Sequence, residues 1–142
     1  MEKLTKEAED IMNERFGKDN IIALATSNNN MPHVRYVNSY YENKTFYVIT
    51  YGKSGKMKDI DSNPNVSIAG DWFTATAKAR NLGWFKKEDN KEIANKLRIA
   101  FKEWIDNGHN NYDDENTIIL ALRLTEGILM SHGIKYEIDF SE

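Results

Sequence analysis

The stretch from Arg35 to Lys56 constrains the fold more than any other part of this sequence. It contains a basic extended segment, a turn at residues 42–44, a second extended segment over residues 45–51, and the helix start Gly52-Lys53-Ser54-Gly55-Lys56. A strand that leads into a helix start can place an arginine fork beside a serine hydroxyl, a lysine and free backbone amides. We therefore expect a small antiparallel β domain with an anion pocket, and phosphate is the candidate anion.

Alternation of apolar and polar residues predicts the remaining strands and helices. Strands are expected at residues 21–26, 34–40, 45–51, 65–70, 73–81, 118–124, 128–131 and 134–140, with a bulge or corner at Glu126-Gly127. Helices are expected from Thr5 to Gly17 as a lid on the barrel, at residues 55–62, and from Glu88 to Trp104 as the longest helix. This order favours a mainly β protein with helices, folded as a small closed or split barrel, over a layered α/β sheet.

Composition predicts the number of domains, the cellular compartment and the kinds of binding partner. The 142 residues, 40% of them hydrophobic, suit one domain over residues 1–142. A formal charge of −3 gives no general attraction to nucleic acid or to acidic membranes. The absence of cysteine excludes disulfides and thiolate metal sites and fits a reducing compartment. With a charged N-terminus and no apolar signal core, the sequence predicts a cytoplasmic protein.

Other readings of the same residues remain open at this point. Ser54 can be a plain helix cap, Arg35 can be a surface ion pair, and the spacing of a P-loop is absent. In the helix at residues 55–62, Met57 and Ile60 are expected to face inward, with Lys56, Lys58 and Asp59 at or near the surface. The three histidines lack ligand spacing, so no metal site is expected. No serine lies in a nucleophile elbow, which argues against a hydrolase.

Four short segments taken together resemble a known family. They are Arg35-Tyr36-Val37, Thr50, Ser54-Gly55-Lys56 and Asn63-Pro64-Asn65-Val66-Ser67. Their order and spacing are similar to the FMN-binding core of the pyridoxamine 5′-phosphate oxidase-like split-barrel family, and most similar to its short, single-domain members described as general stress proteins. The resemblance extends from about Ile21 to Phe140. It implies a homodimer of FMN-binding split β-barrels with two flavin sites at the interface.

The resemblance also implies roles for individual residues. Arg35 and Lys56 would neutralise the FMN phosphate, and Ser54 would hydrogen-bond it. Gly55 stands where the oxidases have an arginine, so one phosphate contact is lost or is replaced by Lys53. The polar edge of the isoalloxazine ring would meet strand residues, namely the backbone of Tyr36, Val37 and Asn38 together with Thr50 and Tyr51.

The second subunit would complete the site. Segments 72–76 and 130–133 correspond to parts that reach the flavin from the partner, which makes Trp72 and His132 candidate contacts. His132, Tyr136 and Trp72 are the candidates for the wall beside flavin N5.

One departure from the family separates this chain from the true oxidases. They carry a late Arg-x-His-Asp-Arg signature, whereas this chain has Ile134-Lys135-Tyr136-Glu137-Ile138-Asp139-Phe140. Ser131 or His132 replaces the tryptophan that precedes that signature. Oxidation of vitamin B6 is therefore not expected. The functions that remain are a flavin-dependent oxidoreductase on a small molecule, a flavin-binding stress protein without a dedicated substrate, and a split barrel that binds haem or a deazaflavin.

Overall fold

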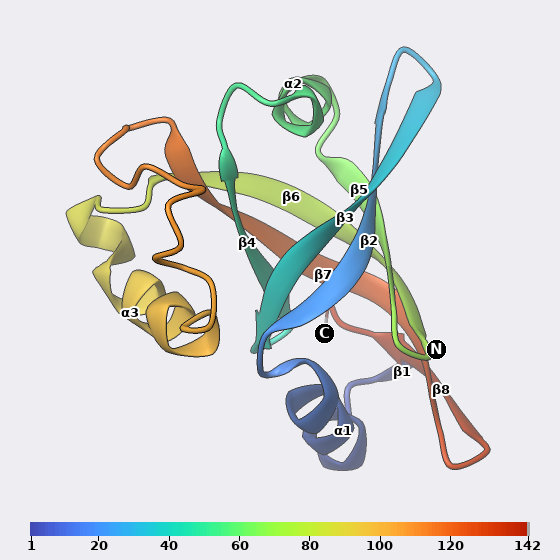
Figure 1. Cartoon of the computed structure of the whole chain (residues 1–142). Helices are drawn as coiled ribbons and strands as arrows, with labels where there is room; N and C mark the ends of the chain where they lie inside the picture. Colours follow the sequence, from blue (N-terminus) through green and yellow to red (C-terminus); the bar gives the residue numbers. More distant parts are fainter. Residues whose placement is uncertain (142) are drawn as a thin grey trace.

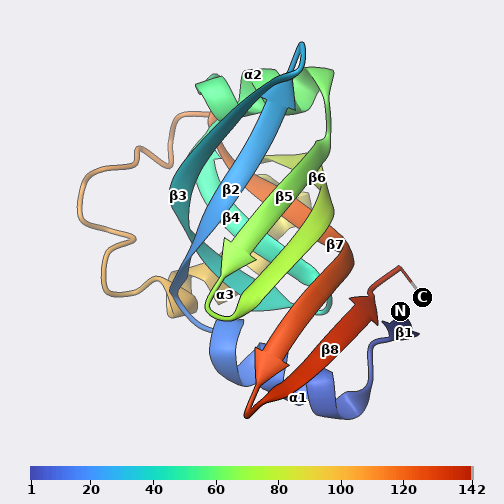
Figure 2. The same cartoon turned by 90° about the vertical axis from the view of Figure 1, so that its right-hand side faces the viewer.

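Six antiparallel strands close into a barrel in the computed structural model, which describes residues 1–141. The strands are β1 (Glu2–Lys3), β2 (Asn20–Asn28), β3 (Met31–Glu42), β4 (Thr45–Tyr51), β5 (Asn65–Gly70), β6 (Phe73–Trp84), β7 (Thr117–Ser131) and β8 (Ile134–Asp139). Around the barrel the order is β7-β4-β3-β2-β5-β6, and pairing of β6 with β7 closes the ring (Figure 1 and Figure 2). β8 pairs with β7 outside the ring, and β1 adds to β8 in parallel. This is the predicted split β-barrel.

Two helices cover opposite ends of the barrel (Figure 1). The helix α1 (Lys6–Phe16) starts at Thr5, whose hydroxyl accepts a hydrogen bond from the Ala8 amide at 3.2 Å. Its buried face joins the barrel core through Ala8, Met12 and Phe16, as the lid prediction requires. The helix α2 (Gly55–Ser62) buries Met57 and Ile60 in the same core. Apolar burial therefore fixes α2, and with it the start of the candidate phosphate site.

The third helix is shorter than the sequence predicts. A 3₁₀ turn at Glu88–Asn90 precedes α3 (Lys91–Ala100), which has 10 residues against 11 in α1, so the prediction of one long helix from Glu88 to Trp104 is wrong. Asn90 uses its side-chain amide to bind two carbonyls of β6, which anchors the start of α3. Beyond the helix, turns bond the Trp104 and Ile105 amides to the Phe101 carbonyl and keep the apolar spacing. The helical spacing of apolar residues therefore predicts which residues are buried, but it does not predict the length of the helix.

The barrel is open between β3 and β4. The two strands pair only where Tyr40–Glu42 meets Thr45–Tyr47. Further along, β3 stays paired with β2 while β4 stays paired with β7, so the strands diverge toward α2 (Figure 1). The edge of β3 that faces β4 is therefore outside the sheet ladder from Arg35 to Asn38, and its backbone donors and acceptors are open to a ligand.

β7 is a single 15-residue strand with a local irregularity. Thr76 pairs with Glu126 and Ala77 with Leu124, so Thr125 is the extra residue of a bulge. The sequence predicts two strands around a corner at Glu126-Gly127, close to this position. Because Gly127 has no side chain, the Phe140 ring can pack closely against the backbone here; a Cβ at this position would lie 3.0 Å from that ring.

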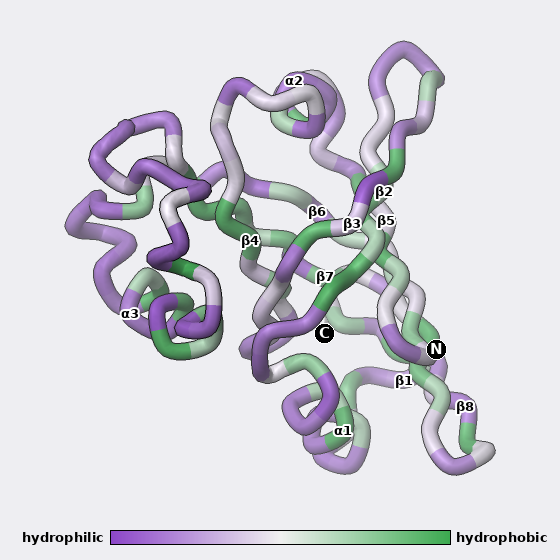
Figure 3. Tube along the Cα trace, viewed as in Figure 1, coloured by the Kyte–Doolittle hydropathy of each residue, from purple (hydrophilic) through white to green (hydrophobic). Residues whose placement is uncertain are grey.

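Polar residues dominate the connections. The tip of the β2–β3 hairpin and the segment between α3 and β7 are largely hydrophilic in Figure 3. Over residues 1–141, no helix is both long and apolar enough to cross a membrane.

Candidate functional site

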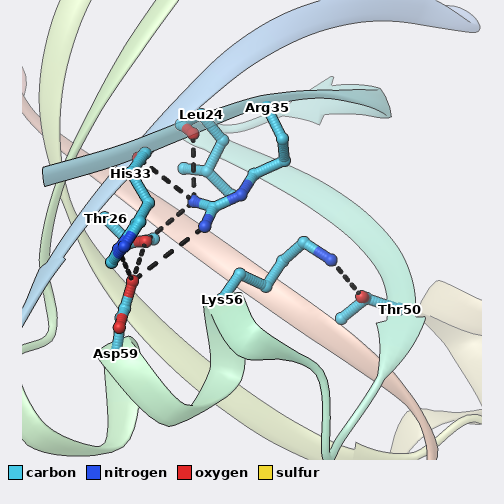
Figure 4. A network of polar contacts seen from close by, with 7 residues as sticks. All are labelled: Leu24, Thr26, His33, Arg35, Thr50, Lys56 and Asp59. Carbon is cyan, nitrogen blue, oxygen red and sulfur yellow. Dashed lines mark hydrogen bonds and ion pairs between the residues drawn. The ribbon is translucent and has the colours of Figure 1, made fainter.

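The start of α2 and the adjoining strands bring five of the predicted residues together. Arg35 lies on β3, Thr50 at the end of β4, and Ser54, Gly55 and Lys56 where α2 begins. Figure 4 shows Arg35 and Lys56 reaching toward the same space from β3 and α2. The spacing predicted from the sequence arises because a tight turn, closed by the Ser54 amide on the Tyr51 carbonyl at 3.0 Å, connects β4 directly to α2.

Arg35 is held by oxygen atoms on one side of its guanidinium. Its Nη1 donates to the Leu24 carbonyl at 3.2 Å, the Thr26 hydroxyl at 2.7 Å and the His33 carbonyl at 3.4 Å (Figure 4). Nη2 lies 4.0 Å from Asp59 Oδ2, and 25% of the side chain is exposed. Burial lowers the pKa of Arg35 while the Asp59 charge opposes that shift. Arginine nonetheless stays cationic at neutral pH, so the site keeps a fixed positive charge.

Lys56 is the second cation of the site. Its Nζ donates to the Thr50 hydroxyl at 2.8 Å (Figure 4), and Thr50 is itself buried. Burial first, and then the charge of Arg35, lower the pKa of Lys56. Among residues 1–141, no carboxylate forms an ion pair with this amine at 4.0 Å or less. Two like charges held near each other favour binding of an anion, which would relieve their repulsion.

Ser54 provides the sharpest geometric observation. It is the residue that precedes α2, yet its hydroxyl makes no capping bond. Its Oγ is buried and has no hydrogen-bond partner among the described residues. Buried polar atoms without a partner are rare in folded proteins. An acceptor bound at the start of α2, where the first helical amides are also unpaired, would satisfy this hydroxyl once rotation about χ1 turns Oγ toward it.

The position of Gly55 leaves room for a ligand. A Cβ built there meets no atom within 4 Å. The neighbouring Lys53 is exposed, so its amine is not packed into the site. The buried hydroxyl of Ser54, the open space at Gly55 and the two cations together fit a phosphate group.

A groove continues from Lys56 along the open edge of β3. Its volume is about 480 Å³, and its walls are Val37, Asn38, Ile49, Thr50 and Lys56 on one side and Trp104, Asn107, His109 and Asn110 on the other. Asp19 ties these walls together, since its carboxylate accepts from Asn38 Nδ2 and from Trp104 Nε1, both at 3.0 Å. A flat ring system attached to the phosphate could lie in this groove.

Two predicted strand residues point away from this groove. Tyr36 is 80% exposed and Tyr51 is 47% exposed. Neither side chain lines the groove, while Val37, Asn38 and Thr50 do. A role for Tyr36 at a flavin is therefore restricted to its backbone, which is the role that the sequence predicts for it.

Trp72 and His132 lie elsewhere in the chain. Trp72 is in the β5–β6 turn and 70% exposed, and His132 is in the β7–β8 turn with Ser131 Oγ at 3.1 Å from its Nδ1. Both have positive φ, at 51°. The β7–β8 hairpin is at the α1 end of the barrel, opposite α2 (Figure 1 and Figure 2). Within one chain the structure does not bring them to Arg35 and Lys56.

The sequence does not predict the roles of three neighbours of the site, Asp59, Thr26 and His33. Asp59 is buried, although the sequence suggested a place at or near the surface. Its Oδ2 accepts from the Thr26 hydroxyl at 2.7 Å and lies 2.9 Å from His33 Nδ1. The signal available was that Asp59 follows Lys56 by three residues, which places the two on neighbouring turns of one helical face. The groove wall at residues 104–110 has no local motif, so only the fold could reveal it.

No three His, Asp or Glu residues of 1–141 are grouped so that they could hold an ion.

Comparison with known proteins places the chain in a family. The family model described as pyridoxamine 5′-phosphate oxidase matches residues 4–130, so the chain belongs to the pyridoxamine 5′-phosphate oxidase-like family. General stress protein 26 of Bacillus subtilis (strain 168) is 29% identical over 122 residues, covering 80% of this chain and 81% of that protein.

Solved structures with low sequence identity share the fold. An FAD-binding protein from Mesorhizobium loti superposes with a TM-score of 0.66 and 12% identity, over 87% of this chain and 92% of that one. The haem storage protein HutZ from Vibrio cholerae superposes with a TM-score of 0.63 and 19% identity, over 86% of this chain and 90% of that one. These likenesses support the split barrel, which carries different cofactors in different proteins.

Proposed function

We propose that this protein binds FMN and acts as a flavin-dependent oxidoreductase on a small molecule. The observation that carries the proposal is the buried, unpartnered hydroxyl of Ser54 at the start of α2, two residues before Lys56, whose amine interacts electrostatically with Arg35. A phosphate monoester would accept from that hydroxyl and neutralise both cations. FMN has this phosphate, and riboflavin lacks it.

The remaining residues would orient the flavin ring. The open edge of β3 offers backbone donors and acceptors, and Asn38 and Thr50 line the same groove. FMN would supply hydride transfer at its N5 position, while the protein binds, orients and shields it. Lys56 would keep its proton on Nζ and contribute charge to binding.

A homodimer is part of the proposal. Ile21, Ala23 and Ala25 of β2 lie beside Asn38, Tyr36 and Val34 of β3 on the outer face of the sheet. Ile21, Val34 and Tyr36 are 61%, 71% and 80% exposed. An apolar surface of this kind favours burial against another chain. A second copy would also supply Trp72 and His132, which are too far from Arg35 in their own chain.

The same experiment also tests two other functions. One is flavin binding without a dedicated substrate, as a stress protein. The other is a split barrel for haem or a deazaflavin, in view of the fold shared with HutZ. The two cations and the Ser54 hydroxyl at α2 favour a phosphate-bearing ligand over haem, although His109 in the groove wall is a residue type that can ligate haem iron.

An FMN titration tests the proposal. FMN fluorescence quenching and a rise in melting temperature are expected for the purified protein, with much weaker binding of riboflavin. NADH or NADPH should then reduce the bound flavin under anaerobic conditions. Binding without reduction would favour the non-catalytic flavin protein or another electron donor. Preference for haem over FMN would contradict the proposal.

A further inference from the structure

Arg35 is the centre of a partly buried network of polar contacts. Three acceptors surround Nη1, and the shortest contact is the 2.7 Å bond to Thr26 Oγ1 (Figure 4). Nη2 is 4.0 Å from Asp59, beyond hydrogen-bond distance. The network therefore fixes one nitrogen of the guanidinium and leaves Nη2 free of a short bond. This is the arrangement expected of an arginine that is oriented before its ligand arrives.

The Thr26 hydroxyl is the link between Arg35 and Asp59. Thr26 is 2% exposed and contacts Asp59 Oδ2 at 2.7 Å. The hydrogen bond from Thr26, followed by that from His33, holds the pKa of Asp59 below its usual value, so Asp59 is an acceptor at neutral pH. The Thr26 hydroxyl has one hydrogen to donate, and it donates this hydrogen to the Asp59 carboxylate. The lone pairs of Thr26 Oγ1 are then directed at the guanidinium of Arg35.

We propose that Thr26, oriented by Asp59, is a positioning residue that aims Arg35 at the ligand phosphate. This inference rests on the proposed function, because it concerns how the same phosphate is held. Thr26 lies beneath Arg35 in the protein, on β2, and acts on the ligand only through the guanidinium. Loss of the hydroxyl would leave Arg35 charged and present, but held only by the longer bonds from Nη1 to the Leu24 and His33 carbonyls, at 3.2 Å and 3.4 Å.

Thr26→Val is the decisive variant, since valine has nearly the same shape and no hydroxyl. FMN affinity should fall about tenfold, while riboflavin affinity stays unchanged, because only the phosphate contact is lost. Thr26→Ser keeps the hydroxyl and should bind FMN within about threefold of the parent. In an Arg35→Ala background, Thr26→Val should cause no further loss, since there is no guanidinium left to orient.

A second variant controls for a loss of stability in Thr26→Val. Thr26→Val leaves the Asp59 carboxylate buried with one donor fewer, which can lower stability. Combining Thr26→Val with Asp59→Asn removes the buried charge as well, and this pair should show the same selective loss of FMN. Circular dichroism and melting temperature report the fold of each variant.

The outcomes separate the two proposals. Equal FMN affinity in Thr26→Val and the parent would overturn the positioning role and leave the phosphate site intact. An equal loss of FMN and riboflavin would also overturn it, because a general structural effect does not distinguish the two ligands. If the parent protein itself binds FMN no better than riboflavin, the phosphate site and the positioning role fail together.

Discussion

The start of α2 and the β7–β8 hairpin both supply candidate flavin contacts, and they differ in how much of the site each builds alone. At α2, Lys56 is fixed on Thr50 at 2.8 Å and Ser54 Oγ is buried without a partner. On the hairpin, His132 is exposed, at a turn with positive φ. The first region is organised within a single chain. In the second, the His132 ring contacts only the neighbouring Ser131, whose Oγ lies 3.1 Å from its Nδ1, among the polar contacts of the described residues.

This difference predicts how binding energy is distributed. Charged hydrogen bonds to a phosphate in a preorganised site contribute more than contacts made by exposed side chains. We therefore expect the α2 region to set the affinity for FMN, and the hairpin to adjust it only in the dimer.

The largest expected effect comes from removing both cations. Arg35→Ala combined with Lys56→Ala should weaken FMN binding by about 100-fold or more, since each charged hydrogen bond is worth about 1.5–3 kcal/mol. Riboflavin affinity should change little. Fluorescence titration measures both ligands, and Lys58→Ala, which removes an exposed lysine from the same helix, is the matched control. Unchanged FMN affinity in the double variant would show that Arg35 and Lys56 do not form the phosphate pocket.

Alkaline pH should weaken FMN binding by a smaller factor. Burial and the Arg35 charge lower the pKa of Lys56 below 10.5, so the amine loses its proton, and with it its attraction for phosphate, earlier than an exposed lysine. The folding stability of the ligand-free protein should change in the opposite direction. The unfolded chain binds the Lys56 proton more tightly than the folded one, so the contribution of Lys56 to the free energy of unfolding rises with pH between its folded-state and unfolded-state pKa values.

Titrations between pH 7 and 10 measure this effect. The FMN affinity of the parent should decline over the range by up to about tenfold, the loss expected for one charged contact. The Lys56→Ala variant should show a flatter profile, and riboflavin corrects for titration of the flavin ring. A profile identical in both proteins would show that Lys56 does not contact the phosphate.

Ser54→Ala should separate binding from stability. Replacing a buried hydroxyl that has no partner should leave the melting temperature unchanged or raise it, although alanine at a helix cap usually costs about 0.5–2 kcal/mol. FMN affinity should fall by about tenfold, because one hydrogen bond to a charged phosphate is lost. A marked loss of stability with unchanged FMN binding would mean that Ser54 serves only the helix.

The two exposed turns that carry Trp72 (β5–β6) and His132 (β7–β8) should give the smallest effect. Trp72→Ala combined with His132→Ala should weaken FMN by only a few-fold, about 1 kcal/mol or less, and should leave a folded protein because both side chains are exposed. Ile21→Glu, placed on the exposed face of β2, should yield monomers in size-exclusion chromatography and the same few-fold loss. Adding Trp72→Ala and His132→Ala to the monomeric variant should have no further effect. Full additivity would argue against contacts from a second subunit.

Sequence prediction succeeded where local chemistry decides the structure. The bounds of α2 and β5 match the predicted ranges, because Ser54 and the Asn63-Pro64 pair mark the ends of the helix. The order of Arg35, Thr50 and Lys56 was enough to predict their proximity, since a hairpin and a tight turn connect them. Short-range geometry leaves few alternatives over such distances.

Prediction failed where burial depends on distant segments. The sequence pattern predicts a surface position for Asp59 on α2. In the structure, β2 and β3 bring Thr26 and His33 to its carboxylate. The wall at residues 104–110 depends on Asp19, more than 80 residues earlier in the chain, which bonds Trp104. Contacts of this kind are fixed by topology, and no local pattern encodes them.

The central claim is that the α2 region recognises a phosphate monoester, and one comparison tests it most directly. Parallel titrations of the unmodified protein with FMN and with riboflavin measure the phosphate's contribution, because the two ligands share the same ring. We predict that FMN binds at least about 100-fold more tightly, the combined effect expected of two cations and a hydroxyl. Equal affinities for the two ligands, or no binding of either, would contradict the account.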